Sequence, residues 1–335
     1  MNRQNLKQII QVTISLGIAI WIFWFLYRDI ALESLLAQIK SSNWLWIFAS
    51  LSISLLGFWL RAWRWTLLIR ADEGEDVVTP NRAYHAVMVG YLVNLLLPRA
   101  GELARCGVLT RTNGISLGHL LGTVILERSV DLLFLVFVIG LAFLAENDLF
   151  LSLASLLIDV ENLWANILSN LPVFLGGLFI FILFIVLILR KYRDHGLIKK
   201  IRHFLREIVS GLKRVNQLSN PLGFWLSSVF IWAIYFLTMY TVSLGIPSTA
   251  NLSSGEVLLV MVMGSIGMIA PVQGGIGTFH ALVAFILIQL GISEEDGKIF
   301  AAIIHGTQVL LMLAAGLISW ILMMRLPTWN KPANP

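Results

Sequence analysis

The sequence predicts an all-α polytopic membrane protein with six transmembrane helices and two re-entrant helical hairpins, arranged as an inverted repeat. The 335-residue chain is 58% hydrophobic and only 13% charged, whereas soluble domains are about half apolar and about a quarter charged. Its apolar residues gather in runs long enough to cross a hydrocarbon core about 30 Å thick. Its Lys and Arg residues divide unequally between the loops, which sets an orientation.

Six apolar stretches are long enough to span the membrane. The first follows a basic start like that of a signal peptide, but it has no clear small-x-small cleavage site, so we expect an uncleaved span. The six predicted spans are Ile9–Leu26, Trp44–Leu60, Leu117–Leu144, Leu171–Leu189, Phe224–Leu244 and Ile299–Met324.

Two further apolar stretches, Tyr84–Leu97 and Val257–Ala270, are each about half a crossing long. Each ends at a proline followed by a glycine, in the sequences PRAG (98–101) and PVQG (271–274). Short, broken apolar segments are typical of re-entrant hairpins. We therefore predict hairpins over residues 83–116 and 257–290.

The basic residues predict which side each loop faces. Loop 190–221 holds nine Lys and Arg residues, and loop 145–170 holds none. With the N-terminus in the cytoplasm, eighteen of the 24 Lys and Arg residues fall inside and three outside. This orientation predicts a multi-pass protein of the cell inner (plasma) membrane with both termini cytoplasmic. The first hairpin then enters from the cytoplasm and the second from outside.

The predicted elements repeat. Each half, residues 1–145 and residues 146–335, contains in order a span, an amphipathic connector, a span, a broken hairpin and a final span. Three full spans separate the two hairpins. The two halves therefore have opposite orientations. The basic connector 190–221 has apolar residues at helical spacing and is expected to lie on the cytoplasmic leaflet. An ordinary amphipathic linker helix without lipid specificity fits this pattern equally well.

The hairpin breaks explain why charge follows apolar sequence. A helix that ends inside the membrane leaves carbonyl groups without partners, and the helix that follows presents N–H groups and a positive dipole end. In the first hairpin, Pro98 stops the helix, Gly101 is expected to let the chain turn, and Arg99 and Arg105 add positive charge. The second hairpin restarts after Pro271 and Gln273 through Gly274, Gly275 and Gly277, with His280 on the first turn. If the restarts face each other, they form an anion site suited to a lipid phosphate.

A second polar cluster lies in the motif LERSVDLL (126–133). Glu127 is about 15 Å along its span from Leu117, near the bilayer midplane. Arg128 and Asp131 are three residues apart and could pair on their own helix. The last span of the second half carries His305 and Gln308 at a similar depth. Deep ionisable groups usually mark a transport pathway, but these charges could instead neutralise one another and lock the hairpin.

Arg61 and Arg64, in the motif RAWRW, follow the second predicted span directly. Flanking cations commonly extend toward the headgroups, so we expect these two residues to anchor the span end rather than bind a ligand. Cys106 is the only cysteine, which excludes a disulfide framework and a cysteine-based metal site.

Three motifs together, NLLLPRAGELAR, ILERSVDLL and MIAPVQGGIGTFHALV, resemble the lysylphosphatidylglycerol synthase transmembrane-region family, also called flippase-like domain proteins. The resemblance covers residues 7 to 325 and implies a lipid-translocating membrane domain. Two positions depart from the family pattern: Gln273 stands where a proline is expected, and His280 where an acidic residue is usual. Without that acid, a cationic headgroup lacks an obvious counter-charge. The pattern carries onto Pro98, Arg99, Gly101, Glu102, Arg105, Glu127, Arg128, Asp131, Pro271, Gly274, Gly275 and Gly277.

The leading hypothesis is a stand-alone lipid transporter that moves a membrane phospholipid or an isoprenoid-phosphate lipid between leaflets. Because the sequence ends eleven residues after the last span, we expect no aminoacyltransferase domain. We expect lipid-phosphate binding by Arg99, Arg105, Arg128, Gly274, Gly275 and Gly277. Structural or coupling roles are expected for Pro98, Gly101, Glu102, Glu127, Asp131, Pro271, Gln273, His280, His305 and Gln308.

Two alternatives stay open. One is a non-transporting accessory protein that docks an enzyme of lipid or glycan assembly. The other is an intramembrane lipid-modifying enzyme, although the sequence has no HExxH motif and no Gly-x-Ser-x-Gly motif. We expect a protein that is not an enzyme, with no catalytic residues, metal, cofactor or nucleic-acid partner.

Overall fold

The computed structural model describes residues 32–74, 77–155, 213–270 and 272–329, together with several residues between 17 and 30. The elements within these ranges are all helical. Four of them are long and apolar enough to cross a membrane: α3 (Trp44–Glu73), α6 (Leu117–Ala145), α11 (Pro221–Gly245) and α14 (Glu294–Met324). They match four of the six predicted spans. The predicted span Leu171–Leu189 lies outside the described residues, as do most of the span Ile9–Leu26 and of the basic connector 190–221.

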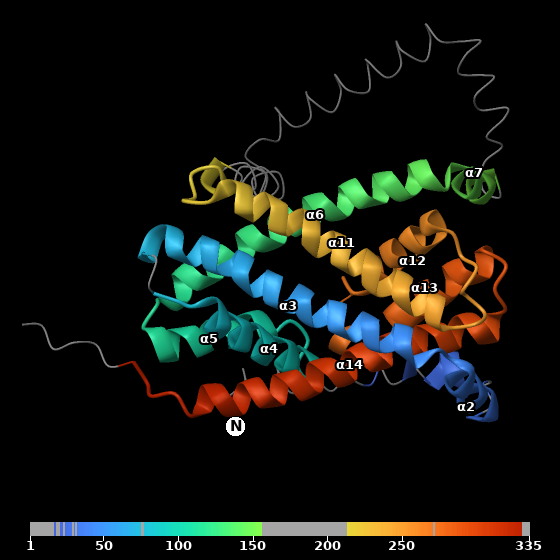
Figure 1. The fold of residues 1–335 in the computed structure, drawn as a ribbon, viewed down its shortest axis with the longest axis horizontal. Coiled ribbons are helices and arrows are strands. Elements are labelled where there is room, and N and C mark those ends of the chain that lie inside the picture. The colour runs from blue at the N-terminus through green and yellow to red at the C-terminus, as the bar shows by residue number, and fades with distance from the viewer. Residues whose placement is uncertain are drawn as a thin grey trace, which may run out of the picture.

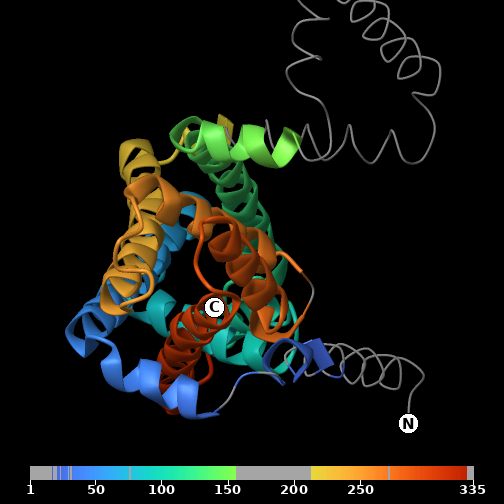
Figure 2. The same cartoon turned by 90° about the vertical axis from the view of Figure 1, so that its right-hand side faces the viewer.

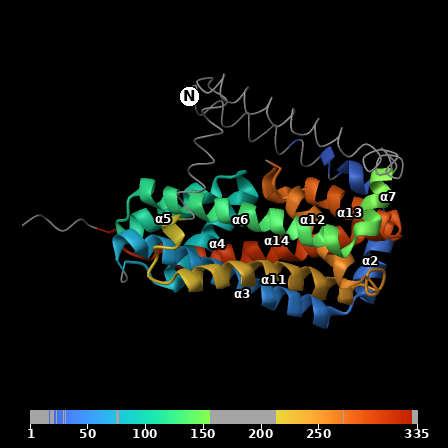
Figure 3. The same cartoon turned by 90° about the horizontal axis from the view of Figure 1, so that it is seen from above.

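Two pairs of shorter helices lie where the hairpins were predicted. The first pair is α4 (Pro80–Leu96) with α5 (Gly101–Asn113), and the second is α12 (Ser254–Gly267) with α13 (Thr278–Gln289). A 3₁₀ turn, η1 (Gln273–Gly275), precedes α13. Figure 1 shows the four long helices along the long axis, with α4 and α5 at one end and α12 and α13 at the other. Figure 3 shows the same separation from a second direction.

The long helices begin at local capping residues. The side chains of Asn43, Ser116, Asn220 and Ser293 accept hydrogen bonds from backbone N–H groups at the starts of α3, α6, α11 and α14. The hairpin helices α4 and α12 also begin at caps, Thr79 and Ser253. In contrast, Ala100 precedes α5 and Gly277 precedes α13, and neither residue provides a side-chain cap. The two helices that restart after the hairpin breaks therefore depend on other groups to satisfy their first N–H donors.

Equivalent helices of the two halves make equivalent contacts. Helix α3 packs along α11, and each hairpin closes on itself through α4 with α5 and α12 with α13. The first helix of each hairpin also packs against the last span of the other half, α4 on α14 and α12 on α6. Figure 2 shows the bundle from the end that carries α12 and α13.

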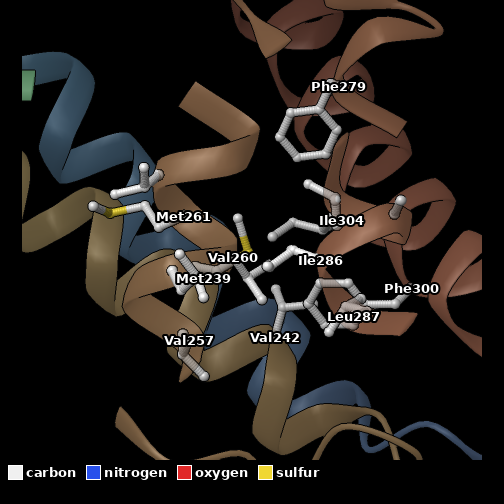
Figure 4. Close-up of a cluster of buried hydrophobic side chains, with 14 of the residues drawn as sticks. Met239, Val242, Val257, Val260, Met261, Phe279, Ile286, Leu287, Phe300 and Ile304 are labelled. Atoms are coloured by element: carbon white, nitrogen blue, oxygen red, sulfur yellow. The ribbon is translucent and has the colours of Figure 1, made fainter. Parts of the chain in front are cut away.

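Two apolar clusters hold the hairpins in place. The larger joins α12 and α13 to α11 and α14 through residues such as Val260, Leu287 and Phe300 (Figure 4). The other packs α4 and α5 against α3 and α6, with Trp65 fully buried. Many large apolar side chains instead lie exposed along the outer faces of the long helices, as expected for surfaces that contact lipid. Two short helices, α2 (Leu32–Ser41) and α7 (Asn147–Ser155), complete the described elements.

Candidate functional site

Helix α3 continues past the predicted end of the second span. The apolar run Trp65–Ile69 extends it to Glu73, so Arg61 and Arg64 lie inside the helix and are buried. The prediction that these two arginines anchor the span end at the headgroups was therefore wrong. Their guanidinium groups point into the protein, where burial of an unpaired charge is strongly unfavourable.

The carboxylate of Glu127 lies at the centre of the cluster that holds these arginines. Its side chain is fully buried on α6. Oε1 accepts a hydrogen bond from Nη2 of Arg61 at 2.8 Å, and Oε2 accepts one from Nη2 of Arg105 at 2.9 Å. Nη2 of Arg64 lies 3.5 Å from Oε1. Three guanidinium groups from α3 and α5 therefore surround one carboxylate, and charge-assisted hydrogen bonds of this kind offset much of its desolvation.

Asp131 joins the same cluster, one turn after Glu127. Its Oδ1 accepts a hydrogen bond from Arg64 at 2.7 Å, and its Oδ2 accepts one from Arg61 at 3.3 Å. The suggested pairing of Arg128 with Asp131 on their own helix was wrong. Arg128 instead donates to Oε1 of Glu102 on α5 at 2.8 Å, which ties the first hairpin to α6.

Polar and aromatic side chains complete the surroundings of the arginines. Arg61 donates to the hydroxyl of Tyr235 at 2.8 Å and Arg64 to that of Ser228 at 3.0 Å, both on α11. The guanidinium of Arg105 stacks over the indole of Trp65, 4.4 Å from the ring centroid. Helix α11 belongs to the second half, so the site draws on both halves of the chain.

The cluster carries one excess positive charge. Its four arginines bear four positive charges against the three negative charges of its acids. Within the described residues, Nε of Arg64, Nε of Arg105 and Oε2 of Glu102 are buried without a hydrogen-bond partner. A buried excess charge with spare donors is unfavourable by itself and favours the binding of an anion. The charged members are Arg61, Arg64, Arg105, Arg128, Glu102, Glu127 and Asp131.

A small pocket opens beside the cluster between α3, α4, α5 and α6. Arg61, Arg105, Arg128 and Glu102 line it, with Asn94 and other residues of α4. Its volume is about 10 Å³, which is room for about one water molecule. The pocket is therefore closed to a lipid headgroup in this conformation.

The pocket reaches the outer surface of α6 at Arg128. The side chain of Arg128 is 46% exposed and that of Glu102 25%. Ile125 and Leu132, three residues before and four after Arg128, are exposed apolar residues. Residues at these spacings share a helix face, so Arg128 interrupts an apolar stripe that faces lipid. The buried cluster thus has an edge at the side of the protein rather than at either end of the bundle.

The first hairpin closes by a near approach of α4 and α5. The N–H of Gly101 donates to Oδ1 of Asn94 at 2.7 Å, which supplies the cap that α5 lacks. A side chain at Gly101 would collide with the Gly90 carbonyl oxygen. The expected role of Gly101 in the turn was wrong, because Arg99 adopts the left-handed conformation (φ 61°) and Gly101 already lies in α5. Pro98 follows the end of α4 as predicted.

The second hairpin turns through glycines. Gly274, Gly275 and Gly277 all have positive φ, between 56° and 87°, which glycine adopts without steric penalty. Gln273 is buried beside them, and Pro271 lies outside the described residues. The N–H of Gly277 donates to Nδ1 of His280 at 3.3 Å. A side chain therefore satisfies the first N–H of the restarting helix here as well.

His280 also meets the last span. Its Nδ1 lies 3.5 Å from Nδ1 of His305 on α14, and the Phe279 and Tyr27 rings pack nearby. Within the described residues, the buried Nε2 atoms of His305 and Gln308 have no hydrogen-bond partner.

The two hairpins meet at their turns. Nη2 of Arg99 donates to the carbonyl of Ile269 at 2.8 Å, and η1 packs against α4. Of the residues predicted to bind phosphate, Arg105 and Arg128 gather with Glu102, Glu127 and Asp131. Gly274, Gly275 and Gly277 lie in the other hairpin, and no hydrogen bond within the described residues joins them to those arginines. The expected anion site between the two restarts is replaced by an arginine cluster within the first half and α11.

Arg61 and Arg64 are the residues that sequence reasoning missed. The apolar run Trp65–Ile69 after Arg64 was the available signal, because it extends the second span and places both arginines within it. Tyr235 and Ser228 carried no such signal, since an isolated hydroxyl in an apolar helix has many ordinary roles.

Three further results bear on the class of protein. Among the described residues, no group of three or more His, Cys, Asp or Glu side chains lies together in a way that could hold a metal ion. No curated protein and no solved structure shows a significant match to the chain. The family model described as the lysylphosphatidylglycerol synthase TM region matches residues 9–316. This protein is therefore a multi-pass membrane protein that belongs to the lysylphosphatidylglycerol synthase transmembrane-region family.

Proposed function

We propose that this protein is a lipid transporter that passes a phosphate-bearing headgroup between the leaflets while the acyl chains stay in the bilayer. The observation that carries the proposal is the buried arginine cluster, whose one excess positive charge reaches an apolar outer face at Arg128. Intramembrane charges are costly and usually mark a transport pathway. A lipid phosphate supplies the missing negative charge and hydrogen-bond acceptors together.

The membrane topology belongs to the same proposal: six spans and two re-entrant hairpins, with halves at 1–145 and 146–335 in opposite orientations. The hairpins at opposite ends of the bundle support it (Figure 1), as do the helix contacts that repeat on exchange of the halves. Basic residues including Arg70, Arg82, Arg111 and Arg325 gather at the α4–α5 end. This favours a cytoplasmic position for that end and for both termini, in the inner membrane.

The headgroup is proposed to enter sideways between α5 and α6. Separation of the Arg128–Glu102 ion pair would open the pocket edge toward lipid, and the phosphate would then reach the donors of Arg105 and Arg61. Because the pocket now has room for about one water molecule, a movement of the first hairpin must accompany entry. Alternation between two such states is the general mechanism of carriers built from repeats.

The same geometry supports a protein without catalytic residues. Both oxygens of Glu127 and both oxygens of Asp131 accept hydrogen bonds from guanidinium groups, which leaves neither carboxylate available as a general base. The docking alternative depends on the basic connector 190–221, most of which lies outside the described residues.

Transport in reconstituted vesicles tests the proposal. Purified full-length protein is placed in vesicles with a trace of fluorescent phospholipid, and transfer to the outer leaflet is followed by chemical quenching. We expect transfer well above that of protein-free vesicles and a fall of about tenfold or more in Arg128→Ala, because one arginine–phosphate contact is worth at least about 1.4 kcal/mol. Arg325→Gln, which removes a charge beyond the end of α14, is the matched control. Unchanged transfer in a folded Arg128→Ala protein would show that the cluster is purely structural.

A further inference from the structure

The arginine cluster specifies more than a negatively charged ligand, because its charge excess is a single unit. Four guanidinium groups face three carboxylates, and every one of these side chains takes part in an ion pair within the cluster. In a water-poor site an uncompensated charge of either sign is strongly unfavourable. The ligand that best completes the cluster therefore brings one net negative charge, neither zero nor two.

The unsatisfied atoms of the cluster specify the hydrogen bonding. Nε of Arg105 is a buried donor without a hydrogen-bond partner, and Arg105 lines the pocket, so this atom suits an oxygen of a phosphate. Oε2 of Glu102 is a buried acceptor without a partner, and Glu102 lines the pocket. A ligand that satisfies both atoms must offer an acceptor to Arg105 and a donor to Glu102.

Resting on the proposed transport function, we infer that the cargo headgroup is a phosphodiester with one net negative charge that also carries a neutral hydroxyl donor, as in a polyol glycerophospholipid. The phosphodiester supplies the single negative charge. The hydroxyl group donates to Glu102 without adding a positive charge to the total.

The charge balance separates this headgroup from its competitors. A zwitterionic headgroup has a donor in its ammonium group, but its net charge is zero, so the excess charge of the cluster remains. A phosphate monoester carries about −1.5 to −2 charges near neutral pH and overcompensates the cluster, and a pyrophosphate does so as well. The inference therefore favours a glycerophospholipid over an isoprenoid phosphate as cargo.

Competition for bound lipid tests the inference. The purified full-length protein is equilibrated with mixed micelles that contain equal amounts of phosphatidylglycerol, phosphatidylethanolamine and phosphatidic acid, and the lipids that remain bound are measured by mass spectrometry. We expect phosphatidylglycerol to be enriched about tenfold over each competitor, the ratio that corresponds to about 1.4 kcal/mol. The soluble headgroup glycerophosphoglycerol, added as a competitor, should displace little lipid.

Variants at the exposed edge of the site change its charge without disturbing the buried core. Arg128→Gln lowers the net charge to zero, and the enrichment of phosphatidylglycerol over phosphatidylethanolamine should fall to about one. Arg128→Lys keeps the charge and should keep most of the preference. Glu102→Gln raises the charge by one unit and removes the carboxylate acceptor, which should shift the preference toward phosphatidic acid. Arg325→Gln, outside the cluster, should leave the bound-lipid profile as in the wild type.

The headgroup series on the wild-type protein decides the matter even if a variant does not fold. Equal enrichment of all three lipids, or preference for phosphatidic acid, would overturn the inferred headgroup. Displacement by glycerophosphoglycerol at the concentration at which the lipid binds would identify a soluble anion instead of a lipid. These results are distinct from failure of the proposed function, because a protein that transfers every phospholipid at one rate is still a transporter, whereas a protein that transfers none is not.

Discussion

The two hairpins share a construction but differ in chemistry. In each, the residue before the second helix provides no side-chain cap, and another side chain accepts the hydrogen bond instead: Asn94 of α4 for α5, and His280 of the helix's own first turn for α13. Each then contacts the span that follows it in sequence. In the first half this contact is an ion pair between Arg105 and Glu127, and in the second it is a pair of histidines, His280 with His305. The first hairpin therefore contributes two charged residues, Glu102 and Arg105, to the cluster, whereas the second hairpin meets its span through histidines.

The difference shows that backbone architecture and binding chemistry vary independently in this protein. The helix contacts that are equivalent in the two halves require matching helix positions. Small and apolar residues provide these positions in both halves. The polar side chains inside each half are free to differ: the first hairpin contributes Glu102 and Arg105 to a charged cluster, and the second brings His280 close to His305.

The largest effect is expected where the charge is concentrated. Glu127→Gln leaves three buried guanidinium groups without their central carboxylate and should lower the free energy of unfolding by about 3–5 kcal/mol. The corresponding change in the second half, His305→Gln, replaces one neutral polar group by another and should cost about 1 kcal/mol. Denaturation of both purified variants in mixed detergent micelles measures the two values. Equal costs would contradict the charge asymmetry between the hairpins.

A second comparison tests the shared construction. Gly101→Ala places a methyl group against the Gly90 carbonyl, and Gly267→Ala places one 2.8 Å from Cα of Phe279. Both hairpins should be destabilised, by about 1–3 kcal/mol each, in the same denaturation assay.

The control for this pair lies in the same helix as Gly101. A side chain at Gly107 meets nothing within 4 Å, so Gly107→Ala should stabilise α5 by up to about 1 kcal/mol through helix propensity. A loss of stability in only one of the two hairpin variants would show that the hairpins close in different ways.

The smallest effect concerns the turns. The first hairpin uses Arg99 in a left-handed conformation, where the second uses glycines. Both Arg99→Ala and Arg99→Gly lose the hydrogen bond to the Ile269 carbonyl. Alanine keeps the steric penalty of a positive φ, whereas glycine adopts the same φ without that penalty. The glycine variant should therefore be more stable than the alanine variant by about 1 kcal/mol. The reverse order in thermal denaturation would mean that the turn relaxes when the arginine is removed.

The sequence was sufficient for features that depend on neighbouring residues. The described spans follow from long apolar runs, and Pro98 with Gly101 located the first hairpin turn to within a few residues, because helix breaks are local. The helix of the second predicted span continues thirteen residues beyond Leu60, to Glu73, because Arg61 and Arg64 find partners inside the protein.

The partners of the charged residues could not be predicted in the same way. A carboxylate three or four residues from an arginine on one helix is an obvious candidate partner, yet Arg128 pairs with Glu102 on another helix and Asp131 pairs with Arg64. Which side chains meet depends on how the helices rotate and pack against one another. That packing is set by the whole bundle, including the contact of α3 with α11 across the two halves.

The crossed packing of the helices has a mechanical consequence. Helix α4 packs on α14, and α12 packs on α6. Each hairpin is therefore held by the last span of the opposite half. Such halves cannot rock apart as rigid bodies without losing both crossed contacts at once. A displacement of one hairpin alone breaks only one of these two crossed contacts, while the long helices keep their positions.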